Sequence, residues 1–224
     1  MRYLKSRRQD QCGVSTLKSQ DTVASSNHAK AEMLNKQFCS VYTQEDTDKM
    51  PDKGPSPYPD MAPITVIRNG IEKLLAKLDP SKASGPDNIS ARLLKTCSSP
   101  ISGMLSYIYQ QTLDTGEVPL DWKSANIAPL FKKGSRSAPS NYRPVSLTSI
   151  CCKVLEHVIV SEVWSHLDKH NFMTDYQHGF RSRRSCETQL FVVSHDITEV
   201  LNRSGQVDAA VLDFAKAFDK VPHE

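Results

Sequence analysis

Asp213 is the residue best placed for metal chemistry, because it ends an apolar run. Ala-Ala-Val-Leu at 209–212 comes directly before it, and Phe214 follows. A buried carboxylate is costly unless a cation or hydrogen-bond donors compensate its charge. Hard oxygen ligands of this kind suit Mg²⁺. The alternative is a strand-end aspartate that caps the following turn, with Lys216 as an ion-pair partner. The local pattern leaves both interpretations open.

Basic side chains are concentrated in the middle of the chain. The segment 123–184 has ten Lys or Arg against four acids, although the formal net charge of the chain is only +3. Two short β-like runs enclose a polar tip, and the basic residues of this region are Lys132, Lys133, Arg136 and, on the returning run, Arg143. Lysine as a point charge and arginine as a bidentate fork both suit phosphate groups. A solvated loop is the alternative interpretation.

Other kinds of catalytic site have little support. A third basic cluster, Arg181, Arg183 and Arg184, is also typical of a solvated helix entry. The three histidines at 157, 166 and 170 have no further Cys or His at ligand spacing, so a zinc site is not expected. The glycines at 85, 134 and 179 are isolated, which excludes a glycine-rich phosphate loop.

Composition limits the class of protein. Hydrophobic residues make up 38% of the 224 residues, and we expect part of the chain to lie outside any core. No run of about 18 apolar residues is present, so a membrane-spanning helix is not expected. The start of the chain is charged without an apolar stretch behind it, unlike a secretory signal. The six cysteines are scattered, and we expect an intracellular protein of the nucleus or cytoplasm, with no membrane partner.

The first 62 residues are predicted to form a flexible connector or tail. Residues 1–28 are rich in Ser, Gln, Lys and Arg, which favours disorder. Residues 29–42 predict one short helix, with Met33, Leu34, Phe38 and Val41 on a common side. Five prolines between Pro51 and Pro63 predict a linker, so we place a domain boundary near Pro63.

The remainder predicts a mixed α/β (α+β) fold. Apolar spacing predicts helices over 64–79, 89–97, 100–114 and 149–168, and a helix from a Ser185 cap to about Asn202. The last of these has Leu190, Val193, Ile197, Val200 and Leu201 on one face. Residues 124–131 and 142–147 predict a β-hairpin with a basic tip. Residues 207–214 predict a buried strand ending at Asp213.

Five segments carry a resemblance to a known family. They are Lys82-Ala-Ser-Gly-Pro-Asp-Asn-Ile89, Pro129-Leu-Phe-Lys-Lys-Gly134, Asn141-Tyr-Arg-Pro-Val-Ser-Leu147, Gln177-His-Gly-Phe-Arg181 and Leu212-Asp-Phe-Ala-Lys-Ala-Phe-Asp219. In this order and spacing the chain resembles the amino-terminal part of a reverse transcriptase from a non-LTR (LINE-type, Jockey-like) retrotransposon. The resemblance covers residues 64–224, and the segment 31–38 resembles the connector that precedes such polymerases.

The resemblance implies a role for individual residues. Asp213 matches the first metal-binding aspartate of a polymerase palm, with the Phe214 carbonyl on the same ion. Phe218 would lie under the nucleotide sugar. Lys132, Lys133 and Arg143 would grip the incoming triphosphate. Gln177, Gly179, Phe180 and Arg181 would contact the template. The implied cofactor is Mg²⁺, two ions in the complete enzyme.

The implied fold is a fingers subdomain over residues 63–206 and the start of a palm over 207–224. The implied partners are an RNA template, a DNA primer or target, and deoxynucleoside triphosphates, with an endonuclease domain in the same parent polyprotein. The 224 residues contain no Asp-Asp pair, the family's second catalytic element. We therefore expect a polymerase truncated before that motif and inactive alone. A non-catalytic nucleic-acid-binding module and a degenerate retroelement relic are the alternatives.

Overall fold

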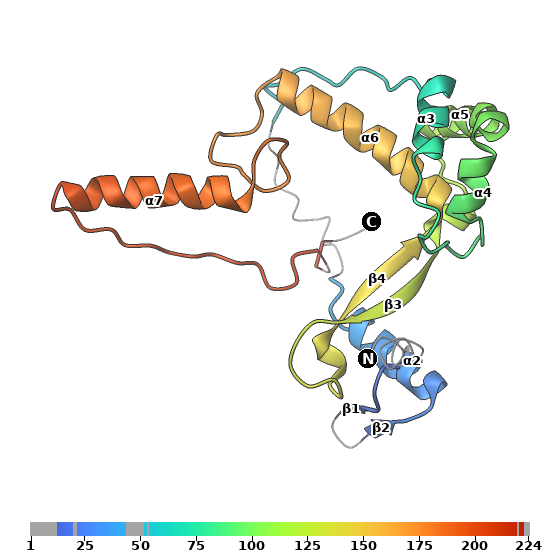
Figure 1. Ribbon diagram of the computed structural model, residues 1–224, viewed down its shortest axis with the longest axis horizontal. Coiled ribbons are helices and arrows are strands. Elements are labelled where there is room, and N and C mark those ends of the chain that lie inside the picture. The colour runs from blue at the N-terminus through green and yellow to red at the C-terminus, as the bar shows by residue number, and fades with distance from the viewer. Residues whose placement is uncertain (1–12, 20–21, 44–51, 53, 219, 222–224) are drawn as a thin grey trace, which may run out of the picture. The chain divides into compact units, whose positions relative to one another are not determined.

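A computed structural model describes residues 13–19, 22–43, 52, 54–218 and 220–221 (Figure 1). The chain forms two compact units. One contains Met1–Asp52, Thr65–Glu156 and Lys216–Glu224, and the other contains Lys53–Ile64 and His157–Ala215. Helices and two separate two-stranded antiparallel sheets make up the described residues. The mixed α/β class expected from the sequence is confirmed at this level.

The elements follow one another as predicted over most of the chain. In the first unit they are β1 (Leu17–Ser19), β2 (Thr22–Ala24), α2 (Asn27–Cys39), α3 (Arg68–Ala76), α4 (Ala91–Thr96), α5 (Ser98–Thr115), the 3₁₀ turn Leu120–Lys123, β3 (Ala125–Phe131), the 3₁₀ turn Pro139–Asn141 and β4 (Tyr142–Thr148). Helix α6 (Ile150–Lys169) begins in the first unit and ends in the second, where α7 (Cys186–Asn202) follows. No helix in the described part of the chain has the length and apolar content to span a bilayer.

The amino-terminal segment is ordered where the structure describes it. Leu17 of β1, Ala24 of β2, and Leu34 and Phe38 of α2 are buried together with Tyr142 of the β3–β4 hairpin. Disorder over 13–19 and 22–28 was therefore a wrong prediction, whereas residues 1–12 and 20–21 lie outside the described residues. The composition of a segment does not reveal apolar surface elsewhere in the chain on which it can fold. The short helix expected over 29–42 is confirmed by α2, which Ser26 caps.

The β3–β4 hairpin has two unlike faces. Its register pairs Phe131 with Tyr142, Leu130 with Arg143, and Pro129 with Pro144. Side chains alternate between the faces of a strand. The Phe131 and Tyr142 face packs on the amino-terminal core. The opposite face carries Leu130 and Arg143, both exposed.

Helices α3, α4 and α5 pack on one another, and the start of α6 lies beside them in Figure 1. Ile71 and Leu75 of α3, Leu94 of α4, and Leu105 and Tyr109 of α5 are buried, as are Ile150, Cys151, Val154 and Leu155 of α6. Helix α3 begins four residues later than the expected start at 64, and Ile67 at its N-cap position is exposed. Helices α3 to α6 otherwise match the four helices predicted over 64–168, and their ends differ from the predicted ends by a few residues.

In the second unit one predicted helix is confirmed and one predicted strand is wrong. The Ser185 cap and its helix are confirmed as α7, but no side chain of α7 is buried in the described structure. Residues 207–214 form no strand, and Val211 and Leu212 are more than nine-tenths exposed. The predicted buried strand is therefore wrong for this structure. A strand needs neighbours for its backbone hydrogen bonds, and within the described residues of this unit none is beside it.

Candidate functional site

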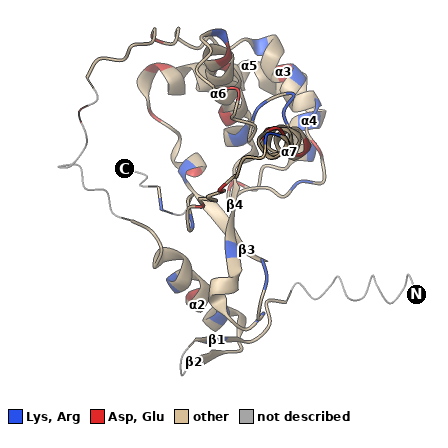
Figure 2. Ribbon diagram, turned by 90° about the vertical axis from the view of Figure 1, so that its left-hand side faces the viewer, with Lys and Arg blue, Asp and Glu red and all other residues tan. Residues whose placement is uncertain are grey.

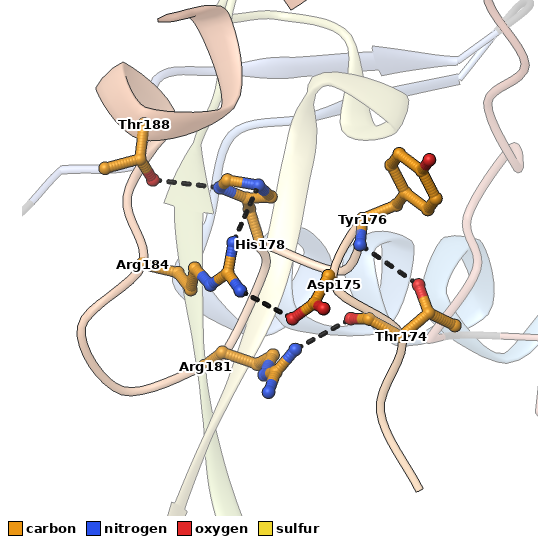
Figure 3. Close-up of polar contacts among 7 residues, drawn as sticks. All are labelled: Thr174, Asp175, Tyr176, His178, Arg181, Arg184 and Thr188. Carbon is orange, nitrogen blue, oxygen red and sulfur yellow. Dashed lines mark hydrogen bonds and ion pairs between the residues drawn. The ribbon is translucent and has the colours of Figure 1, made fainter. Parts of the chain in front are cut away.

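The loop before α7 contains a connected set of polar side chains, drawn in Figure 3. Arg184 reaches Asp175 at 2.9 Å (Nη2 to Oδ1) and the His178 ring at 3.4 Å (Nη1 to Nε2). The other ring nitrogen of His178 lies 2.8 Å from Thr188 Oγ1 on the first turn of α7. The set links the start of the loop, through one buried histidine, to the helix that follows it.

The start of α7 is a capping box. Ser185 Oγ accepts the Thr188 N–H at 3.2 Å, and Thr188 Oγ1 accepts the Ser185 N–H at 2.9 Å. Such reciprocal bonds satisfy two of the amide donors that every helix start leaves unpaired. A hydrogen bond from Ser185, and a weaker one from its own backbone N–H, lowers the pKa of Glu187 on the same turn. The loop therefore ends at a firmly defined helix start.

The four residues predicted to contact a template lie together in this loop. Gln177 donates from Nε2 to the Gly179 carbonyl at 3.1 Å, and Arg181 donates from Nη1 to the Thr174 carbonyl at 2.7 Å. Phe180 is 88% exposed and has a positive φ of 59°. Arg181 is thus engaged in holding the loop, while Gly179 and Phe180 face outward.

His178 is the residue of this site that sequence reasoning missed. Its side chain is only 7% exposed. It lies inside the Gln-His-Gly-Phe-Arg segment, but the resemblance assigned no role to it. The only sequence signal was the Ser185-x-x-Thr188 spacing of a capping box, and that spacing does not indicate a histidine ten residues upstream of Thr188.

The hairpin divides the basic residues predicted to bind phosphate; Figure 2 shows Lys and Arg along it. Arg143 extends from β4 on the uncovered face, opposite Leu130. The Lys132 N–H donates to the Asn141 carbonyl at 2.9 Å, which continues the ladder beyond the strand ends. The alternation of strands then places Lys132 on the side of Leu130 and Arg143. Lys132, Lys133 and Arg143 are all exposed.

Arg136 belongs to the other face of the hairpin. Its guanidinium lies 4.4 Å from the centre of the Phe131 ring, a cation–π contact. Its carbonyl accepts hydrogen bonds from Ser15 Oγ at 2.8 Å and from the Tyr142 hydroxyl at 2.7 Å. Arg136 therefore helps to join the hairpin tip to the amino-terminal core, and it is separated from the Arg143 face.

The residues predicted to hold a metal are exposed. Asp213 and Phe214 lie in the extended segment of the second unit, and Phe218 lies in the first. Asp213 offers one oxygen ligand of the type that Mg²⁺ prefers. No group of three metal-binding side chains occurs within the described part of the chain. The described residues thus fit one ligand of a magnesium site and do not complete one.

Comparison with known proteins gives a family match for the carboxy-terminal part of the chain. The model of the reverse transcriptase (RNA-dependent DNA polymerase) family matches residues 131–224, a range that contains the β3–β4 hairpin from Phe131 onward, the Gln177–Arg181 loop and Asp213. Residues 131–224 are thus similar to the reverse transcriptase family. The resemblance drawn from the five sequence segments is confirmed.

Similar proteins come from insect mobile elements. The RNA-directed DNA polymerase from mobile element jockey of Drosophila melanogaster is 29% identical over 170 residues, covering 75% of this chain and 19% of the relative. The probable RNA-directed DNA polymerase from transposon BS of the same species is 28% identical over 200 residues, covering 88% and 22%. The chain spans about a fifth of the length of these relatives.

Proposed function

We propose that this chain forms the part of an RNA-directed DNA polymerase that grips the incoming nucleotide and the template. Its working substrates would be an RNA template, a DNA primer or target, and deoxynucleoside triphosphates. The observation that carries the proposal is the two-faced hairpin, because it leaves Arg143 exposed and leaves Arg136 to join the tip to the core. Division into a connector (1–62), fingers (63–206) and palm start (207–224) remains part of the proposal.

Each basic residue would contribute according to its chemistry. Arg143 would bind two oxygens of a triphosphate through its guanidinium fork, and Lys132 and Lys133 would add point charges. The loop residues Gly179 and Phe180 would meet the template, where an exposed aromatic ring can stack on a base. Phe218 would contact the sugar of the nucleotide.

Asp213, with the Phe214 carbonyl, would hold one Mg²⁺. Bound magnesium in a two-ion site supports attack of a primer hydroxyl on the α-phosphorus and stabilises the leaving pyrophosphate. Because the 224 residues contain no Asp-Asp pair, a polypeptide of these residues alone is expected not to extend a primer. We propose polymerase activity only for a longer protein that contains these residues.

Binding of a labelled RNA–DNA primer–template by the 224-residue chain tests the nucleic-acid part. We expect fluorescence anisotropy to show binding that weakens steeply between about 50 and 200 mM salt. Arg143→Ala should reduce the slope of log affinity against log salt by about 1. Arg92→Ala is the matched control, because Arg92 is an exposed arginine on α4. Absent or salt-insensitive binding of the unmodified chain would contradict the proposal.

A hybrid enzyme tests the catalytic part. Residues 131–224 of this chain would replace the matching segment of the Drosophila jockey polymerase. Primer extension by the hybrid that Asp213→Asn abolishes and Asp208→Asn preserves would support the role of Asp213. A hybrid that binds primer–template without extending it would instead favour the second candidate, a nucleic-acid-binding module without catalysis, which the excess of basic residues over 123–184 motivates.

A further inference from the structure

We propose that His178 is a positioning residue whose neutral ring fixes the loop 174–184 on the first turn of α7. The proposal rests on the function above in one respect only, namely that this loop contacts the template. The fixing of the loop itself is a separate claim, and it can be tested without any nucleic acid.

The geometry gives His178 a central place in the loop. It is the only buried side chain between positions 174 and 188 of the described chain. Its two ring nitrogens face different partners, Thr188 Oγ1 at 2.8 Å and Arg184 Nη1 at 3.4 Å (Figure 3). Arg184 in turn meets Asp175 at 2.9 Å. One imidazole ring thus connects both ends of the loop to the helix.

A single arrangement of protons satisfies these contacts. A guanidinium can only donate, so Nε2 of His178 must accept from Arg184. The ring proton then lies on Nδ1 and is donated to Thr188 Oγ1. Thr188 uses its own hydroxyl proton on the Ser185 carbonyl at 3.0 Å. Its oxygen thus accepts from both His178 and the Ser185 backbone.

A second proton on the ring would break this arrangement. An N–H at Nε2 would point toward the Arg184 guanidinium, where it finds no acceptor and a like charge. The other charged or titratable side chains on the two connected segments are Asp175, Tyr176, Arg181 and Arg183 on the loop, and Cys186 and Glu187 on the first turn of α7. Only Asp175 among the loop residues is an acid, and its side chain is 90% exposed, so it can compensate little of the added charge.

The loop requires such a fixed point because of its backbone. Phe180 and Arg183 both have positive φ, 59° and 62°, although neither is glycine. Non-glycine residues persist in that conformation only when their surroundings hold them there. With His178 anchored, Phe180 is held outward. Without it, the loop gains freedom and Phe180 loses its fixed orientation.

Cleavage by trypsin reports how mobile the loop is, because trypsin cuts after Lys and Arg and the loop contains Arg181, Arg183 and Arg184. We would measure cleavage in the loop relative to cleavage after Lys132 and Lys133 in the same sample. His178→Asn keeps an amide near the position of Nδ1, and His178→Gln keeps one near the position of Nε2, so each retains one of the two contacts. His178→Asn, which loses the contact with the Arg184 guanidinium, should raise the relative cleavage of the loop at least about fivefold, the size expected for losing a hydrogen bond to a charged group. His178→Gln, which loses the contact with the neutral Thr188 hydroxyl, should raise it at least about twofold. His195→Asn, an exposed histidine on α7, should leave it unchanged.

The pH dependence separates positioning by a neutral ring from simple space filling. A histidine ring can gain a second proton as the pH falls. Relative cleavage of the loop should therefore rise with decreasing pH in the unmodified chain. It should stay flat in His178→Gln, which has no proton to gain. Equal pH dependence in both proteins, or cleavage unchanged in both variants, would overturn the proposal.

Primer–template binding then links the loop to function. If the proposed function holds, His178→Gln should bind primer–template more weakly than the unmodified chain at high pH. The two dissociation constants should become similar at low pH, because a second proton on His178 loosens the loop of the unmodified chain as well. If the unmodified chain fails to bind at all, the proposed function fails, while the proteolysis still decides the role of His178. If binding is normal in both variants although the loop is loosened, the link between this loop and the template is wrong.

Discussion

Gly85 lies so close to Ser149 that a Cβ atom added at Gly85 would be 2.5 Å from the Ser149 backbone nitrogen. The same atom would lie 2.6 Å from the carbonyl carbon of Thr148. The turn that contains Gly85 therefore packs directly against the junction of β4 and α6. The Asn88 N–H donates to the Gly85 carbonyl at 3.1 Å and closes this turn. The geometry of this junction therefore depends on a residue without a side chain at position 85.

Gly85→Ala is expected to destabilise the first unit by about 1–3 kcal/mol, because backbone must move to admit the methyl group. Gly70→Ala is the matched control. Gly70 lies in α3 with nothing within 4 Å of its added Cβ, and alanine is favoured over glycine in helices by about 1 kcal/mol. Urea unfolding followed by circular dichroism would compare the two. Equal stability of both variants would show that the close contact is not maintained in solution.

Tyr109→Phe should cost about 0.5–1.5 kcal/mol of unfolding free energy, because it removes a buried hydrogen bond. The fully buried Tyr109 hydroxyl donates to the Cys151 carbonyl at 2.7 Å and joins α5 to α6. Tyr107→Phe removes the same hydroxyl from a 67% exposed side chain on the same helix. Thermal unfolding should show a lower Tm for the first variant only. A similar Tm for both would contradict this hydrogen bond.

The thiols should differ in reactivity. Burial, with a smaller contribution from Asp87, raises the pKa of Cys151 to about 11, and burial followed by Glu156 raises the pKa of Cys152 to about 11. At pH 8 both are protonated, and the thiolate is the reactive form. Iodoacetamide should therefore label the exposed Cys39 and Cys186 first. Peptide mass spectrometry would follow the rates, and early labelling of Cys151 would contradict its burial.

The same shifts predict how stability depends on pH. An unfolded thiol ionises near pH 8.5, whereas Cys151 and Cys152 in the folded chain keep their protons to about 11. The folded state therefore binds more protons than the unfolded state in this window. The unfolding free energy should fall as pH rises from about 9 to 11. Below that range these two thiols should add nothing to the pH dependence of the unfolding free energy. Cys151→Ser with Cys152→Ser should flatten the decline.

Local pattern was sufficient for the helices and the hairpin. The apolar spacing of α3 and α5, the Ser185 cap of α7 and the two β-like runs each depend on near neighbours in sequence. Their faces were harder to assign. Helix α7 has the apolar periodicity of a packed helix, yet the described structure contains nothing that buries it. Periodicity tells which residues would face a partner and not whether that partner is present.

The parts that could not be predicted depend on contacts distant in sequence. Ser15 and Arg136 are 121 residues apart, and their hydrogen bond links the amino-terminal segment to the hairpin tip. The sequence grouped Arg136 with the basic residues that suit phosphate, and it gave no sign of this link to the amino-terminal segment. The candidate site residues were named by resemblance, whereas the buried ring of His178 became visible only once Thr188 was placed beside it.

Leu34→Ala tests whether the amino-terminal segment is an integral part of the first unit. Leu34 of α2 is buried with Phe38 and with Tyr142 of β4. Removing its side chain should cost about 2–5 kcal/mol through lost burial and the cavity left behind. Leu93→Ala, the same change at a half-exposed position on α4, should cost little.

Hydrogen exchange would locate the effect. The Lys18 N–H donates to the Ser137 carbonyl at 2.7 Å, so the edge of the short amino-terminal sheet is tied to the hairpin tip. In Leu34→Ala, exchange should accelerate at Lys18 and in α2, and also at Phe131 and Tyr142. Fast exchange confined to residues 13–43, with the hairpin as protected as before, would mean that the segment folds on the hairpin without supporting it. Acceleration on both sides would establish that the connector predicted over 1–62 contributes to the hairpin that carries Arg143.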